Sequence, residues 1–62
     1  MSELKRAAQF RIEFIKEHPE LEQQVEELFQ LMMDEIDEGN SASNEVDLFI
    51  SACDDLLISD EQ

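Results

Sequence analysis

Two side chains in the sequence could take part in catalysis, His18 and Cys53. His18 is the only side chain whose unperturbed pKa lies near neutral pH, and Cys53 is the only strong nucleophile. No serine, second histidine or second cysteine is spaced to complete a catalytic arrangement with either of them. We interpret His18 as an exposed turn residue and Cys53 as an unreactive thiol on the apolar side of a helix. The sequence therefore predicts a protein that is not an enzyme and needs no cofactor.

Residues 34–45 carry part of the pattern of a calcium-binding loop. If Gly39 takes the sixth position of such a loop, Asp34 is first and Glu45 is twelfth, as the motif requires. Ile36, however, stands at the third position, where an oxygen ligand is needed. We therefore predict no metal site and interpret Gly39 as the end of a helix, with a calcium-binding helix–loop–helix as a minor alternative.

Apolar residues recur at helical spacing in three segments of the chain. This pattern predicts three short helices, at about residues 3–17, 20–38 and 43–58. His18 and Pro19 separate the first two, because a residue that precedes proline avoids the α-helical conformation. Gly39 ends the second helix, and the polar residues after it can cap the third.

The predicted fold is all-α, with one small domain over residues 1–62. Short connections make consecutive helices neighbours, so we expect an antiparallel hairpin of the second and third helices with the first packed across it. The acidic C-terminus, residues 59–62, is expected to fray. A chain of 62 residues buries little core, and its lone cysteine cannot form an internal disulfide. We therefore expect a homodimer, which would enlarge the core.

Charge divides the chain into two parts. All four basic residues, Lys5, Arg6, Arg11 and Lys16, lie in the first predicted helix. Residues 17–62 contain no basic side chain and hold all of the 17 Asp and Glu residues except Glu3 and Glu13. Such a surface repels nucleic acid and anionic membranes, so we expect no direct binding to either. The sequence also lacks the apolar run of a signal peptide or a membrane span, which predicts a cytoplasmic protein.

A row of carboxylates follows the outer face of the second predicted helix. Its members are Glu20, Glu27 and Asp34, at seven-residue intervals, with Glu38 nearby. This acidic row could serve solubility, or it could recognise a basic protein surface. Seven residues of helix span roughly 10 Å, whereas duplex DNA presents a charge about every 1.7 Å. Mimicry of DNA would therefore need further carboxylates, and we keep it as an alternative function.

Apolar side chains at the edge of the predicted core are the candidates for a partner or dimer interface. They are Phe10, Phe14, Met32, Met33 and Leu48. Leu31 and Met33 lie at the edges of the apolar face of the second helix. Arg11 falls within the apolar face of the first helix, so we also consider a partly buried ion pair with a carboxylate of the second or third helix, for which Glu35 is the candidate.

The residues HPELEQQVEELFQLMMDEIDEGNSASNEVDLFISACDDLL, with a short helix before them, resemble the small early-region proteins of lambda-like bacteriophages. More narrowly, the chain is similar to the short open reading frames of the exo–xis region. The resemblance implies an early protein that alters bacterial host or phage developmental physiology through contact with host proteins. It assigns no functional residues. From the residues and the resemblance together we expect a non-enzymatic, acidic, helical interaction protein in the host cytoplasm.

Overall fold

The computed structural model describes residues 2–60, with side chains through Ile58. Three α-helices follow one another along the chain, α1 (Glu3–Glu17), α2 (Glu22–Asp37) and α3 (Ala42–Asp60). A short 3-10 helix, η1 (Pro19–Leu21), joins α1 to α2. The predicted all-α fold of three helices is therefore confirmed. The last two residues of the segment expected to fray, 61–62, lie outside the described residues, and α3 continues through Asp60.

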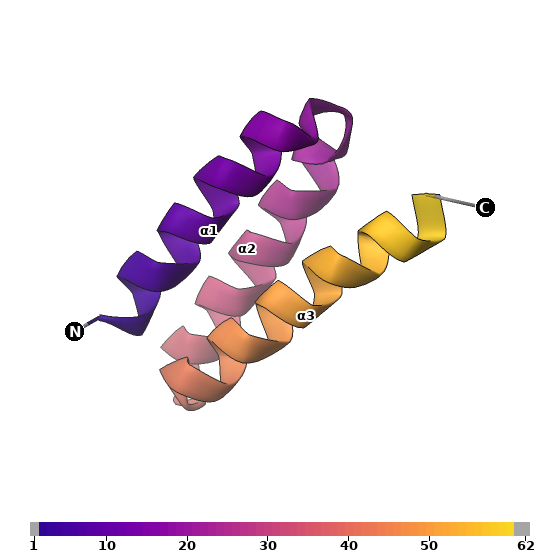
Figure 1. The fold of residues 1–62 in the computed structure, drawn as a ribbon. Helices are drawn as coiled ribbons and strands as arrows, with labels where there is room; N and C mark the ends of the chain where they lie inside the picture. The colour runs from indigo at the N-terminus through magenta and orange to yellow at the C-terminus, as the bar shows by residue number, and fades with distance from the viewer. Residues whose placement is uncertain (1, 61–62) are drawn as a thin grey trace.

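The helices pack as an antiparallel hairpin of α2 and α3 with α1 against both (Figure 1). α1 lies along α2, and the far end of α3 points away from the other two helices (Figure 1). None of the helices in the described part of the chain combines the length and the apolar character that crossing a bilayer requires.

The connection between α1 and α2 is a tight turn at His18. The backbone of His18 leaves the helical region, with φ −133° and ψ 66°, as expected for a residue before proline. Its N–H still donates to the carbonyl of Phe14 at 2.8 Å, and its carbonyl accepts from the N–H of Leu21 at 3.0 Å. Pro19 can begin η1 because the first turn of a helix leaves its N–H groups without intrahelical partners. The second predicted helix thus starts as one turn of 3-10 helix.

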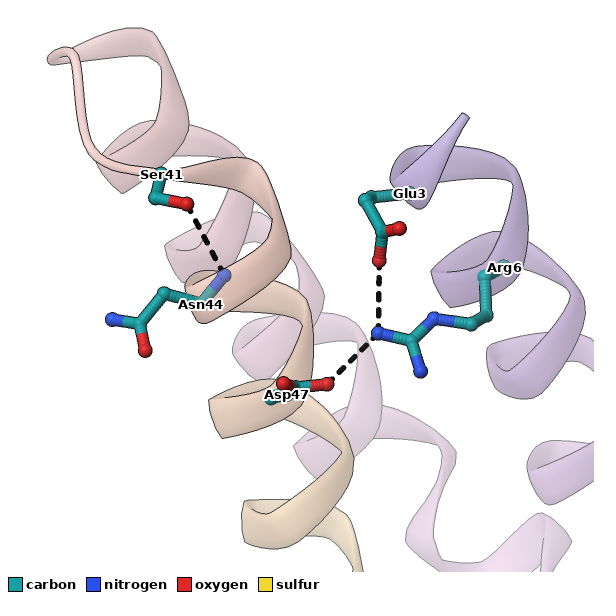
Figure 2. A network of polar contacts seen from close by, with 5 residues as sticks. All are labelled: Glu3, Arg6, Ser41, Asn44 and Asp47. Carbon is teal, nitrogen blue, oxygen red and sulfur yellow. Dashed lines mark hydrogen bonds and ion pairs between the residues drawn. The ribbon is translucent and has the colours of Figure 1, made fainter. Parts of the chain in front are cut away.

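The connection between α2 and α3 is closed by a Schellman motif centred on Gly39. Gly39 has φ +109°, a conformation that glycine adopts without strain. Its N–H donates to the carbonyl of Ile36 at 3.0 Å. The N–H of Asn40 donates to the carbonyl of Glu35 at 3.2 Å. Ser41 then caps α3, because its Oγ accepts from the N–H of Asn44 at 3.5 Å (Figure 2).

The core lies where the three helices meet. Its buried residues are Ala7, Phe14, Leu21, Val25, Met32, Val46, Phe49 and Cys53. Phe49 of α3 joins all three helices, because its ring centroid is 5.9 Å from that of Phe10 in α1 and 5.5 Å from that of Phe29 in α2. Both pairs have the edge-to-face geometry that aromatic rings prefer.

Two arginines of α1 join it to the acidic helices. Arg6 Nη2 donates to Asp47 Oδ1 of α3 at 2.8 Å and to Glu3 Oε1 at 2.9 Å (Figure 2). Arg11 Nη1 donates to Glu26 Oε2 of α2 at 2.6 Å. The opposite charges of α1 and of the other two helices therefore meet within the single chain.

Candidate protein-binding groove

The two side chains with catalytic potential lie in different elements, Cys53 in α3 and His18 in the turn after α1. Cys53 is fully buried in the core, and burial, with the nearby carboxylate of Asp54, raises the pKa of its thiol to about 11. A thiol with this pKa is protonated at neutral pH. The predicted place of Cys53 on the buried, apolar side of its helix is confirmed. His18 lies in the turn after α1, as predicted, but it is partly buried and not exposed, because its ring centroid lies 5.0 Å from that of Phe14. Its Nδ1 is 3.9 Å from Glu20 Oε2.

The segment that resembles a calcium loop has a different conformation. Residues 34–37 belong to α2 and residues 42–45 belong to α3, so only a short turn separates the two helices. A calcium loop needs most of its residues outside helices, so that their oxygens can surround the ion. Within the described residues, no three His, Cys, Asp or Glu side chains gather as metal ligands would. The interpretation of Gly39 as a helix end is confirmed.

Most of the candidate interface residues pack inside the single chain. Phe14 and Met32 are buried in the core, and Phe10 and Met33 are partly buried against it. These four side chains therefore help to hold the fold together, and whether any of them also contacts a partner stays a prediction. The two edges of the apolar face of α2 differ, because Met33 is partly buried against the core whereas Leu31 is exposed. Of the five, only Leu48 is exposed.

An apolar groove opens between α2 and α3, and we call it the α2/α3 groove. It has a volume of about 360 Å³. Leu31 of α2 and Leu48 of α3 lie in it, and 56% of the surface of each residue is exposed. The remaining lining residues are Leu28, Met32, Glu35, Glu45, Phe49 and Ala52. No family model, curated protein or solved structure matches the chain.

The groove has one acidic end and one apolar end. Glu35 comes shortly before the turn between α2 and α3, and Glu45 comes shortly after it, so both lie at the turn end of the hairpin. Leu28 and Ala52 line the other end. Glu35 Oε1 accepts from Asn40 Nδ2 at 2.9 Å, which fixes one carboxylate beside the turn. A ligand in the groove would meet apolar surface along its length and negative charge at one end.

The ion pair of Arg11 differs from the expected one. Arg11 is paired with Glu26 and not with Glu35. α1 and α2 run antiparallel from the turn at Pro19, and Arg11 and Glu26 are about equally far from that turn, whereas Glu35 is at the opposite end of α2. The pair is partly buried, because 27% of the Arg11 side chain is exposed, and the guanidinium carbon lies 5.0 Å from the centroid of the Phe29 ring.

The acidic row lies on the surface, as its spacing predicts. Glu20, Glu27, Asp34 and Glu38 are all exposed. The row begins in η1 and ends at the residue that caps α2, so it is longer than the α-helix itself. One member is held by a neighbour, since Asp34 Oδ1 accepts from Gln30 Nε2 at 3.2 Å. Whether the row contacts a partner stays a prediction.

Of the two exposed leucines in the groove, Leu31 is the one that the sequence did not identify as a candidate. It lies at the edge of the apolar face of α2, where helical spacing alone does not distinguish a core position from an exposed one. A clue is present in the spacing of Leu28, Leu31 and Glu35 in α2 and of Glu45, Leu48 and Ala52 in α3. Each trio follows intervals of three and four residues, which define a stripe beside the main apolar face.

Proposed function

We propose that this chain is a non-enzymatic interaction protein that binds another protein through the α2/α3 groove. The observation that carries the proposal is the pair of half-exposed leucines, Leu31 and Leu48, on two helices that face one groove. A contiguous apolar surface on a small protein is costly in water unless a partner covers it, so such surfaces are common at binding sites.

Two features support the non-enzymatic part of the proposal, the buried thiol of Cys53 and the short turn at Gly39 that joins α2 to α3. Cys53 is enclosed and protonated, and the carboxylates of residues 34–45 are spread along helices. The groove itself contains apolar side chains and two carboxylates. This composition suits binding, in which apolar area supplies affinity and charge selects the partner.

The resemblance to phage early-region proteins leads us to propose a host bacterial protein as the partner, met in the host cytoplasm. The contact would alter host or phage developmental physiology. The homodimer expected from the short chain also stays a proposal, and sedimentation equilibrium would test it.

Affinity capture from bacterial lysate with matched variants tests the proposed function. The variant Leu31→Ser/Leu48→Ser removes the apolar lining of the groove. The control, Ile12→Ser/Ile58→Ser, removes two isoleucines that are 58% and 64% exposed but do not line it. We expect a specific partner to be retained by the wild type and the control, at low and high salt, and lost by the groove variant. Equal capture by both variants would contradict the proposal.

Mimicry of DNA is the alternative, and salt separates it from the groove proposal. A partner that recognises phosphate-like charge would be released as salt rises and competed by duplex DNA. Its capture would depend on the acidic row, so Glu20→Gln/Glu27→Gln/Asp34→Asn would lose the partner while Leu31→Ser/Leu48→Ser would keep it.

A further inference from the structure

We propose that the occupant of the α2/α3 groove is a single amphipathic α-helix of the partner, with an apolar stripe and Lys or Arg at one end of that stripe. The inference rests on the proposed function and adds the chemistry of the partner. Its three parts are the length of the groove, the position of its charges and the absence of cations on its walls.

The length of the groove matches about two turns of a helix. On the α2 side its lining residues extend from Leu28 to Glu35, and on the α3 side from Glu45 to Ala52. Each wall covers eight residues of helix, and the seven steps between its first and last residues span roughly 10 Å. A guest helix with apolar residues at positions i, i+3 or i+4, and i+7 presents anchors over the same length, which is the usual pattern for a helix bound in a groove.

The charges of the groove select a basic guest. Glu35 and Glu45 line its turn end. Among the described residues, no cation lies within 4 Å of either carboxylate, because the ion pairs of Arg6 and Arg11 are with Asp47 and Glu26 on other parts of the helices. A Lys or Arg beside the apolar stripe of the guest would pair with these carboxylates, and an acidic guest would be repelled.

The same charges argue against a second copy of this chain in the groove. A symmetric dimer through the groove would place α2 and α3 of one copy against α2 and α3 of the other. Residues 17–62 contain no basic side chain, so carboxylates would meet carboxylates. α1 of a second copy carries Lys5 and Lys16 as well as the engaged Arg6 and Arg11, but it is also a poor guest. Its apolar side is packed into its own core through Ala7 and Phe14, so it cannot enter the groove of another copy while its own chain stays folded.

Designed peptides test the identity of the guest. Three labelled peptides of about 18 residues are long enough to form a helix when bound. The first has a leucine stripe and two lysines at one end of it, the second has glutamates in place of the lysines, and the third keeps the lysines but has its leucines scrambled off the stripe. Fluorescence anisotropy measures binding, and amide chemical shifts of the labelled protein locate the site.

We expect the first peptide to bind, with shifts centred on Leu31 and Leu48, and the other two to bind about tenfold more weakly or not at all. Leu31→Ser/Leu48→Ser should abolish binding of the first peptide, whereas Ile12→Ser/Ile58→Ser should not change it. Glu35→Gln/Glu45→Gln should remove the preference for lysine over glutamate. Circular dichroism of each variant establishes that it is folded.

Three results would overturn the inference. Equal binding of the lysine and glutamate peptides would remove the charge argument. Failure of every peptide to bind, while capture from lysate still depends on Leu31 and Leu48, would show a guest of another kind and leave the proposed function standing. A dimer in sedimentation equilibrium that Leu31→Ser/Leu48→Ser dissociates would show that the groove is occupied by a second copy.

Discussion

Burial decides the chemistry of Cys53. The thiol is enclosed by the core, where the neutral form is favoured over the thiolate, and the carboxylate of Asp54 adds to this preference. Its pKa is raised from 9.0 to about 11. In the unfolded chain the thiol is exposed to water and loses its proton at a lower pH. The stability of the protein must therefore depend on pH above 9.

We expect the free energy of unfolding to fall as pH rises from about 9 to about 11, because in this window the unfolded chain releases the Cys53 proton and the folded chain retains it. The slope contributed by one group is at most about 1.4 kcal/mol for each pH unit. Urea denaturation across this range measures it. Cys53→Ala serves as the control, since it keeps every other titrating group. If the variant shows the same slope as the wild type, Cys53 is not the cause.

The ion pair of Arg11 and Glu26 should make a small but measurable contribution to the free energy of unfolding. Both side chains are partly exposed, at 27% and 45%, so solvent screens their attraction. A double-mutant cycle with Arg11→Met and Glu26→Gln should give a coupling energy of about 0.5 kcal/mol. The corresponding cycle with Glu35→Gln should give none, because Glu35 is at the far end of α2. A larger coupling of Arg11 to Glu35 than to Glu26 would contradict the arrangement of α1 and α2.

At the scale of elements, Gly39 ends α2 and sets the direction of α3. Its φ of +109° is strained for any residue with a Cβ, and a Cβ added there would meet no atom within 4 Å. Gly39→Ala should therefore act through the backbone alone and lower the free energy of unfolding by about 1 kcal/mol or more. For a domain of this size, 1 kcal/mol corresponds to roughly 4–8 °C in Tm.

The neighbouring residue provides the control for Gly39. Glu38 has φ −81°, in the ordinary helical region, so Glu38→Ala should change the free energy of unfolding by less than about 0.5 kcal/mol. Thermal unfolding followed by circular dichroism measures both variants. Equal Tm values for the two variants would mean that the positive φ of Gly39 is not required for the turn.

The helices could be predicted from the sequence because their signals are local. Pro19, Gly39 and the polar residues before α3 act through the conformation of their own backbone, and apolar spacing identifies the face that each helix buries. The groove could be predicted only in part. It depends on how α2 and α3 are rotated against each other, and the spacing within one helix does not contain that rotation. Met32 and Leu48 were therefore identified as interface candidates, but Leu31 was not.

The partner of Arg11 was missed for a related reason. Helical spacing placed Arg11 on a partly buried face, which the structure confirms with a side chain that is 27% exposed. The choice among carboxylates depends instead on the register of α1 against α2. That register is set by the turn at His18 and Pro19, which makes Glu26 the neighbour of Arg11.

At the scale of the whole molecule, net charge opposes folding. The chain carries a formal charge of −13, and the described residues extend 35 Å along their longest axis. At 0.01 M salt the Debye length is about 30 Å, so carboxylates across the molecule repel one another, whereas at 0.1 M it is about 10 Å and only neighbours do. Salt also weakens the ion pairs of Arg6 and Arg11, but these are few and partly exposed.

We therefore expect Tm to rise as sodium chloride increases from about 0.01 M to about 0.5 M, since screening relieves more repulsion than attraction. Glu20→Gln/Glu27→Gln/Asp34→Asn removes three exposed carboxylates of the acidic row and leaves both interhelical ion pairs in place. This variant should have a higher Tm at low salt and a smaller rise with salt, as thermal unfolding would show. A Tm that falls with salt would mean that the ion pairs of α1 outweigh the repulsion within α2 and α3.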